Sequence, residues 1–161
     1  MSSDLAKEFV KQMDERVNEA VCGSLAWVLK MMAERFGEVA YQVFVKERGK
    51  EIVKHMRNKA EKLGDNSLEA FIVDQWETLP DQGYKYTIEK TDSGYQMIVT
   101  KCPLHELAKQ HGTTEQMFYM CCEGDQFAPE GFNPEIGFKR TKTLMQGDNC
   151  CNHFYFNKET K

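Results

Sequence analysis

Hydrophobic side chains recur at steps of four, with one step of seven, along the first 36 residues, and Glu and Lys lie between them. This spacing, from Leu5 to Phe36, is typical of an amphipathic helix with a wide apolar face. Gly37 is expected to end or bend the helix. A second helical stretch is predicted over residues 39–63, and a shorter one follows it and ends before Pro80.

The hydrophobic period changes after about residue 81. Aromatic and β-branched residues alternate with polar ones over residues 84–100 around a turn at 91–94, and this pattern predicts a β-hairpin. A second hairpin is predicted to join residues 135–145 to 150–156 through a turn at 147–148. Helices first and antiparallel strands second indicate an α+β fold, with long N-terminal helices packed on one face of a small antiparallel sheet.

Short helices are predicted between the two hairpins. Pro103 is suited to open the first of them. Thr113 and Gln116 have the spacing of a capping box for the next helix, which Gly124 is expected to end. Residues 125–134 are rich in aromatic side chains and contain Pro and Gly, so they are predicted to form a loop.

Length and composition limit the class of protein. The 161 residues suit one α+β domain over 1–161, with a helical half at about 1–80 and a hairpin-rich half at about 81–161. Lys and Arg number 21 against 25 Asp and Glu, a formal charge of −4 without clustered cations, so neither nucleic acid nor a membrane is an expected partner. The absence of a long apolar run and of an apolar leader predicts a cytoplasmic protein.

Six cysteines are present, and four of them form the vicinal pairs Cys121-Cys122 and Cys150-Cys151. Adjacent cysteines rarely bridge each other, and no export signal accompanies them. We therefore interpret all six as free thiols in a reducing compartment.

The last hairpin brings charged and reactive side chains to one face. Even positions of its first strand include Arg140 and Lys142. If residues 147–148 are the turn, Leu144 faces Cys151, Lys142 faces His153 and Arg140 faces Tyr155. Two cations on such a face need a protein carboxylate or an anionic ligand, unless the face is simply solvated.

The sulfur and imidazole groups allow two sharper interpretations. Cys102, Cys122, Cys151 and His153 form a candidate zinc or iron site, although no C-x-x-C knuckle is present. The other interpretation is a nucleophilic thiol assisted by His153 or Asp125.

A family resemblance emerges from the motifs of the C-terminal third. They are C-x-x-D at Cys122 and Asp125, the R-T-x-T-L strand that begins at Arg140, and Gly147 followed four residues later by Cys151. Together these motifs resemble the L-2-amino-thiazoline-4-carboxylic acid hydrolase family. Asn152 stands where the family pattern has Asp after its final Cys.

The resemblance implies hydrolytic opening of a small cyclic amidine that carries a carboxylate, without a cofactor. Arg140, with Lys142, would hold the carboxylate, and Cys102 and Tyr155 would complete the substrate site. Asp125 or His153 would move protons, and Cys122 or Cys151 would be a nucleophile or a pocket wall. The alternative hypothesis is a small-molecule-binding or sensor domain with the Cys/His metal site. A homodimer through the N-terminal helices is the expected assembly.

Overall fold

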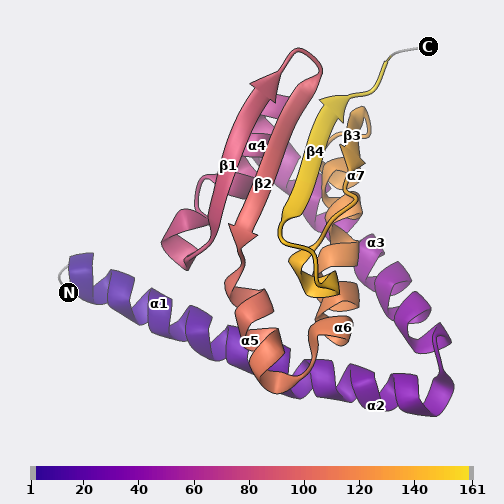
Figure 1. Cartoon of the computed structure of the whole chain (residues 1–161). Helices are drawn as coiled ribbons and strands as arrows, with labels where there is room; N and C mark the ends of the chain where they lie inside the picture. The colour runs from indigo at the N-terminus through magenta and orange to yellow at the C-terminus, as the bar shows by residue number, and fades with distance from the viewer. Residues whose placement is uncertain (1–2, 160–161) are drawn as a thin grey trace.

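The computed structural model describes residues 3–159, and the side chains of Glu8 and residues 11–159 (Figure 1). The side chain of Leu5, which begins the predicted apolar stripe, lies outside this part. Three helical segments run end to end at the N-terminus, α1 (Ser3–Ala20), the π-helical η1 (Val21–Leu25) and α2 (Ala26–Phe36). Gly37 ends this rod with a positive φ of 71°, which glycine adopts without strain, so the predicted helix boundary is confirmed.

Two further helices lie behind the sheet. Helix α3 (Val39–Leu63) has the predicted bounds. Helix α4 (Leu68–Trp76) ends before Pro80, as predicted, and the short η2 (Pro80–Gln82) begins there. Figure 1 shows α3 leaving one end of the rod and passing behind the sheet, with α4 behind the first two strands. Helices α3 and α4 therefore belong to the layer that covers this face, and α7 (Phe127–Phe132) packs beside α3 in the same layer.

The four strands form one antiparallel sheet in the order β1-β2-β4-β3. Their bounds are Lys85–Thr91, Gly94–Lys101, Ile136–Lys139 and Cys151–Asn157 for β1, β2, β3 and β4. The first hairpin is confirmed, since β1 pairs with β2. The sheet lies after the long helices in the chain, so the α+β prediction is confirmed. Helices α3 and α4 lie behind one face of the sheet, whereas the rod of α1 and α2 runs past one end of it.

The predicted register of the second hairpin is wrong by two residues. Strand β3 has only four residues, and Tyr155 pairs with Phe138 rather than with Arg140. His153 pairs with Met97 of β2. Residues 140–143 leave the sheet, and the turn is formed by η5 (Leu144–Gln146) rather than by residues 147–148 alone. A shift of two residues keeps each side chain on its predicted face, because side chains alternate with a period of two.

The segment between the hairpins is more helical than predicted. It comprises α5 (Pro103–His111), α6 (Thr114–Met117), the π-helical η3 (Phe118–Cys122), η4 (Glu123–Gln126) and α7 (Phe127–Phe132). The predicted loop over 125–134 is therefore wrong. Pro129 lies in the first turn of α7, where its missing N–H costs nothing. Gly131 packs against the backbone of Val53, which leaves no room for a side chain.

The predicted capping box is also wrong, because both of its side chains bind elsewhere. The Thr113 hydroxyl donates a hydrogen bond of 2.8 Å to the carbonyl oxygen of Cys22 in η1. The Gln116 amide donates one of 2.8 Å to the Tyr41 hydroxyl. These bonds tie α5 and α6 to the N-terminal rod and to α3.

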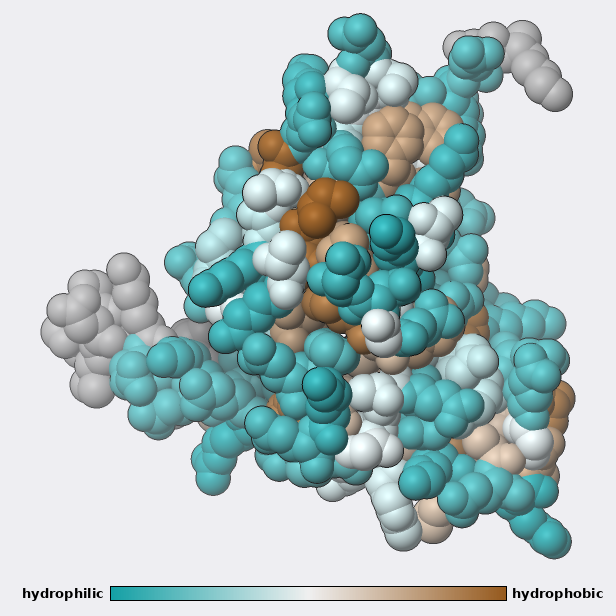
Figure 2. Space-filling view, viewed as in Figure 1, coloured by the Kyte–Doolittle hydropathy of each residue, from teal (hydrophilic) through white to brown (hydrophobic). Residues whose placement is uncertain are grey.

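One face of the sheet is buried under helices. Met97 and Val99 of β2 and Cys151 and Tyr155 of β4 lie in a core shared with Phe71 and other residues of α4. The opposite face is open in Figure 1, and Figure 2 shows it as mostly hydrophilic with hydrophobic residues gathered near its centre. Within residues 3–159, no helix is long and apolar enough to cross a bilayer.

Candidate functional site

A pocket of about 250 Å³ lies between the buried face of the sheet and the helices at one end of the core. Four cysteines line it, Cys102, Cys121, Cys122 and Cys151, and we call it the thiol pocket. Six of the eight predicted site residues line this pocket, namely Cys102, Cys122, Asp125, Cys151, His153 and Tyr155. The chain thus gathers at one place most of the residues that the motifs indicated.

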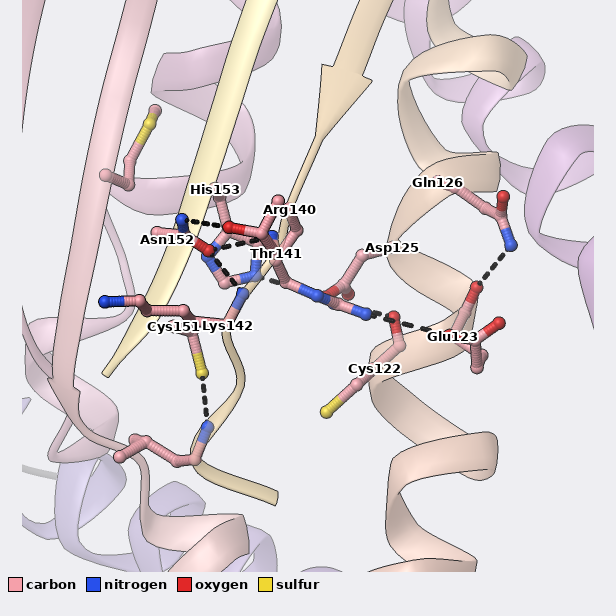
Figure 3. Close-up of polar contacts among 12 residues, drawn as sticks. Cys122, Glu123, Asp125, Gln126, Arg140, Thr141, Lys142, Cys151, Asn152 and His153 are labelled. Atoms are coloured by element: carbon pink, nitrogen blue, oxygen red, sulfur yellow. Dashed lines mark hydrogen bonds and ion pairs between the residues drawn. The ribbon is translucent and has the colours of Figure 1, made fainter. Parts of the chain in front are cut away.

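Asp125 and His153 form the polar centre of the site. Asp125 comes from η4, and its Oδ2 lies 3.2 Å from Nε2 of His153, which is on β4 (Figure 3). A carboxylate only accepts hydrogen bonds, so in the neutral imidazole the hydrogen is on Nε2 and Nδ1 keeps a lone pair. Nδ1 is buried and has no partner among the described residues.

The rings of Trp76 and Phe138 pack around the imidazole of His153, in addition to its contact with Asp125. His153 is 8% exposed, and the Trp76 ring meets it edge to face at a centroid distance of 5.2 Å. The Phe138 ring lies 5.9 Å away at a tilt of 34°. A buried polar nitrogen without a partner is unfavourable, so the site is suited to a ligand or a water that donates a hydrogen bond to it.

Arg140 holds the carboxylate of Asp125 from the other side. Its Nη1 lies 2.5 Å from Asp125 Oδ2 and donates a second bond of 2.8 Å to the carbonyl oxygen of Cys122. The guanidinium lies 5.9 Å from the centre of the Phe118 ring and 5.8 Å from that of Phe138, and the side chain is only 8% exposed. Arg140 is therefore placed to position Asp125, and its predicted contact with a substrate carboxylate stays a prediction.

Lys142 is exposed and is not among the described residues that line the pocket. The side chain of Asn152 holds the backbone of residues 141–142. Its Oδ1 accepts hydrogen bonds from the N–H groups of Thr141 and Lys142 at 3.0 and 2.7 Å. Its amide donates a third bond, of 2.8 Å, to the Thr141 hydroxyl. The residue that replaces the family's Asp thus shapes the segment that follows Arg140, and no pocket carboxylate is lost with it.

Burial raises the pKa of three of the pocket thiols more than the groups around them lower it. The pKa of Cys121 is raised to about 12 by burial, with the negative charge of Asp125 acting in the same direction. Burial and Asp125 also raise the pKa of Cys122 far above its usual range. Burial raises the pKa of Cys151 as well, although its Sγ accepts a hydrogen bond of 3.3 Å from the N–H of Leu144. All three thiols are protonated at neutral pH.

Cys102 has a different environment. It is the N-cap residue of α5, directly before Pro103. Burial raises its pKa, but the N–H groups of His105 and Leu104 and the hydroxyl of Tyr84 act in the opposite direction. It is the pocket thiol with the most groups that stabilise a thiolate.

Several pocket residues were not predicted from the sequence. They include Trp76, Tyr84 and Cys121. Trp76 does belong to the core, and only the packing of α4 on β4 brings one edge of it to the pocket. For Cys121 a signal existed, because in a helix two adjacent cysteines differ by only about 100° in direction and can border one cavity.

The four residues of the candidate metal site do not form a metal-binding cluster. In the part of the chain that the structure describes, no three His, Cys, Asp or Glu side chains are close enough together to hold an ion. Three of these side chains are thiols whose pKa is raised, which disfavours the thiolate form that a metal needs.

The fold is similar to that of a solved structure, trafficking protein particle complex subunit 3 from Naegleria fowleri covalently bound to palmitic acid. The similarity covers 90% of this chain and 97% of that one, with a TM-score of 0.55 and 15% sequence identity. At this identity the likeness concerns the fold alone. No curated protein matches the sequence. A model of the L-2-amino-thiazoline-4-carboxylic acid hydrolase family matches residues 5–155, nearly the whole chain, and the chain therefore belongs to this family.

Proposed function

We propose that this protein hydrolyses a small cyclic amidine such as L-2-amino-thiazoline-4-carboxylate. The observation that supports the proposal best is the Asp125–His153 pair, which leaves Nδ1 of a buried histidine without a partner at a pocket of about 250 Å³. A histidine oriented by a carboxylate is the usual arrangement for moving a proton to and from a reacting group. The family membership supports the same reaction class.

The reaction that we propose consumes one water molecule. Nδ1 of His153 takes a proton from water as its oxygen bonds to the ring carbon between sulfur and nitrogen. The bond from that carbon to the ring sulfur then breaks, and the imidazolium returns the proton to the sulfur. The product is the carbamoyl derivative of cysteine, and no redox step is needed. Asp125, held by Arg140, stabilises the imidazolium that forms in between.

The composition of the pocket suggests how the substrate enters. No Lys or Arg is among the described residues that line it, whereas Asp125 contributes a carboxylate and four cysteines contribute sulfur. Polarisable sulfur atoms suit a ring that contains sulfur. We propose that the amidine end of the substrate binds inside and that its carboxylate stays at the mouth, where it is solvated. This proposal replaces the predicted contact of the carboxylate with Arg140, because Arg140 pairs with Asp125. The analogue 2-amino-2-thiazoline, which lacks the carboxylate, should then also be hydrolysed.

The test is turnover of a panel of cyclic amidines, measured as product by mass spectrometry. Replacing His153 with Asn should lower kcat by roughly 10²–10⁴-fold, because a positioned general base contributes that much. The matched control is His55→Asn, since His55 is exposed on α3 away from the pocket. Full activity of His153→Asn, or no turnover of any amidine by the unaltered protein, would contradict the proposal.

Small-molecule binding without turnover is a second candidate, and the four pocket thiols favour it. A protein of similar fold holds palmitic acid covalently, and a Cys/His metal site was the other form of this hypothesis. Elemental analysis for zinc and iron and the intact mass of the purified protein test it. One equivalent of metal, or a mass increase that hydroxylamine removes, would support binding, and an unmodified metal-free protein would contradict it.

We also propose a homodimer through the N-terminal rod, because large hydrophobic side chains along it are exposed. They include Met13, Val17, Leu25, Trp27, Val28, Met31, Met32 and Phe36. Light scattering should give twice the 18.7 kDa of one chain, and Val17→Glu combined with Val28→Glu should give a monomer. A monomeric unaltered protein at micromolar concentration would contradict this assembly.

A further inference from the structure

Cys102 lies where a helix N-terminus opens toward the thiol pocket. It is the N-cap of the nine-residue helix α5, and Pro103 follows at the first helical position. Ser or Asp is usual at an N-cap, because the side chain there accepts hydrogen bonds from the free N–H groups of the second and third helical residues. In α5 these groups belong to Leu104 and His105. The thiol makes no capping hydrogen bond to them in the structure, but both N–H groups lower its pKa, and a thiolate there would lie at the positive end of the helix dipole.

A second and independent feature points to a ligand at the same place. His153 lines the pocket together with Cys102, is 92% buried, and has no partner for Nδ1 among the described residues. Tyr84 also lines the pocket, and its hydroxyl lowers the pKa of the Cys102 thiol. A thiol, a base with a free lone pair and a hydroxyl donor therefore surround one small space, which is the composition of a site for nucleophilic catalysis.

We propose that Cys102 is the nucleophile of the site and forms a covalent intermediate with the amidine carbon of the substrate. This inference rests on the proposed function. The other candidates are less suited. Asp125 is the largest charge that raises the pKa of Cys122, whereas it is the smallest of the causes that act on Cys102. Cys151 has one N–H group that favours its thiolate, that of Leu144, whereas Cys102 has two. The motifs had indicated Cys122 or Cys151. Cys122 lies where η3 continues directly into η4, and Cys151 begins strand β4, so neither starts a separate helix as Cys102 does.

The covalent route balances in two steps. In the first, Nδ1 of His153 takes the proton of the Cys102 thiol, the sulfur bonds to the ring carbon, and the bond from this carbon to the ring sulfur breaks. The imidazolium gives its proton to the departing ring sulfur, which leaves an isothiourea attached to Cys102. In the second step His153 deprotonates water, which adds to the same carbon, and the Cys102 sulfur departs with the proton. The carbamoyl product is the same as that of direct hydrolysis.

A base is needed in the first step because the buried thiol is protonated at neutral pH. Burial raises the pKa of Cys102, while the groups around its sulfur act against this rise. His153 is the basic side chain that the described lining of the pocket contains. Its two roles, with the thiol and then with water, use the same nitrogen and the same support from Asp125.

The first test labels the thiols and does not depend on turnover. It uses iodoacetamide on the otherwise unaltered protein with Cys150→Ser, which removes a partly exposed thiol outside the pocket. Peptide mapping should find Cys102 modified ahead of Cys121, because two N–H groups and the Tyr84 hydroxyl favour the thiolate of Cys102, whereas burial and Asp125 disfavour that of Cys121. His153→Asn should slow the labelling of Cys102. Modification of Cys121 or Cys122 ahead of Cys102 would overturn the proposal.

The second test follows the reaction itself. Acid quenching during turnover should trap a mass increase of one substrate on Cys102, and Cys102→Ser should lower kcat/KM by roughly three orders of magnitude or more. Cys102→Ala should give the same loss, whereas Cys150→Ser should keep full activity and fold equally well. Turnover that survives in Cys102→Ser would overturn the covalent route and leave the proposed hydrolysis standing. Selective labelling of Cys102 without turnover of any amidine would support the nucleophile and reject the amidine substrate.

Discussion

Arg140 and Asp125 join the two layers of the protein at the pocket. Arg140 follows strand β3, Asp125 belongs to η4 in the helical layer, and Nη1 of the arginine lies 2.5 Å from Oδ2 of the aspartate. The same oxygen is 3.2 Å from the imidazole of His153. The carboxylate thus accepts from a buried cation and orients the proposed base at the same time (Figure 3). Its position sets the direction in which the free nitrogen of His153 points.

Replacing Arg140 should therefore affect both stability and activity. Arg140→Met leaves Asp125 without its buried partner, and breaking a buried ion pair costs about 3–5 kcal/mol. We expect the lower end of that range, because the Asp125 side chain is 35% exposed. Urea unfolding measures the loss, and kcat should fall with it. Lys139→Met is the matched control, since Lys139 is exposed and only stacks on Phe156, and its stability should stay within about 0.5 kcal/mol.

Replacing Asn152 with Asp, the residue of the family pattern, should cost less stability than replacing it with Ala. Asn152→Asp keeps the oxygen that accepts from the N–H groups of Thr141 and Lys142, and loses only the bond to the Thr141 hydroxyl. Asn152→Ala loses all three bonds and frees the segment that carries Arg140, at a cost of about 1 kcal/mol or more. Thermal unfolding and kcat of the two variants side by side provide the measurement. Equal behaviour of Asn152→Asp and Asn152→Ala would show that these bonds do not hold the segment.

The sequence was most informative where one strong period continued for several turns. The helical rod ending at Gly37 and helix α3 have the expected bounds, because their apolar positions repeat over many residues. The first hairpin is also local, since its turn chemistry and its alternation agree. In each case the residues that decide the structure are close together in the chain.

The errors arose where distant packing decides the structure. Pro129 and Gly131 are residues typical of loops, and a loop was predicted there. Both belong to helix α7, which packs on α3 with Gly131 at the point of closest approach. The register of β4 against β3 was wrong because residues 140–150, with η5 among them, form a longer connection than a two-residue turn, and Asn152 holds its bend. No local pattern reveals either feature. The site still came together, since a shift of two residues left Tyr155 and His153 on the face that had been predicted.

Gly131→Ala should destabilise the protein by forcing α7 away from α3. An added Cβ would lie 2.6 Å from the carbonyl oxygen of Val53 and 2.7 Å from its Cα, and backbone atoms inside a helix cannot yield easily. We expect a loss of about 1–3 kcal/mol, as for other overpacked cores. Because α7 continues directly from η4, the displacement should also move Asp125 and lower kcat.

Gly124→Ala is the comparison for this substitution. There the added Cβ would meet only Cδ1 of Ile52, the far end of a flexible side chain, at 2.9 Å. The loss of stability should be clearly smaller than for Gly131→Ala. Urea unfolding of both variants decides the matter, and an equal loss would mean that the contact with the Val53 backbone is not what fixes α7.

Alkaline pH should destabilise the protein through its buried thiols, and Cys121 offers the clearest case. Burial raises its pKa to about 12 in the folded protein, from the ordinary thiol value of 9.0. Below pH 9 the thiol is protonated in both states, so stability does not depend on it. Above pH 9 the unfolded chain loses the proton first, which favours unfolding by up to about 1.4 kcal/mol per pH unit.

Urea unfolding of the unaltered protein and of Cys121→Ala at pH 8, 9 and 10, with a reducing agent present, measures this contribution. The free energy of unfolding should fall with pH less steeply in Cys121→Ala, because one titrating group is gone. Ile52→Ala is the control, since it truncates a side chain that packs against the core without removing a titratable group, and should lower stability equally at each pH. Identical pH slopes for the unaltered protein and Cys121→Ala would mean that this thiol ionises as readily in the folded pocket as in water.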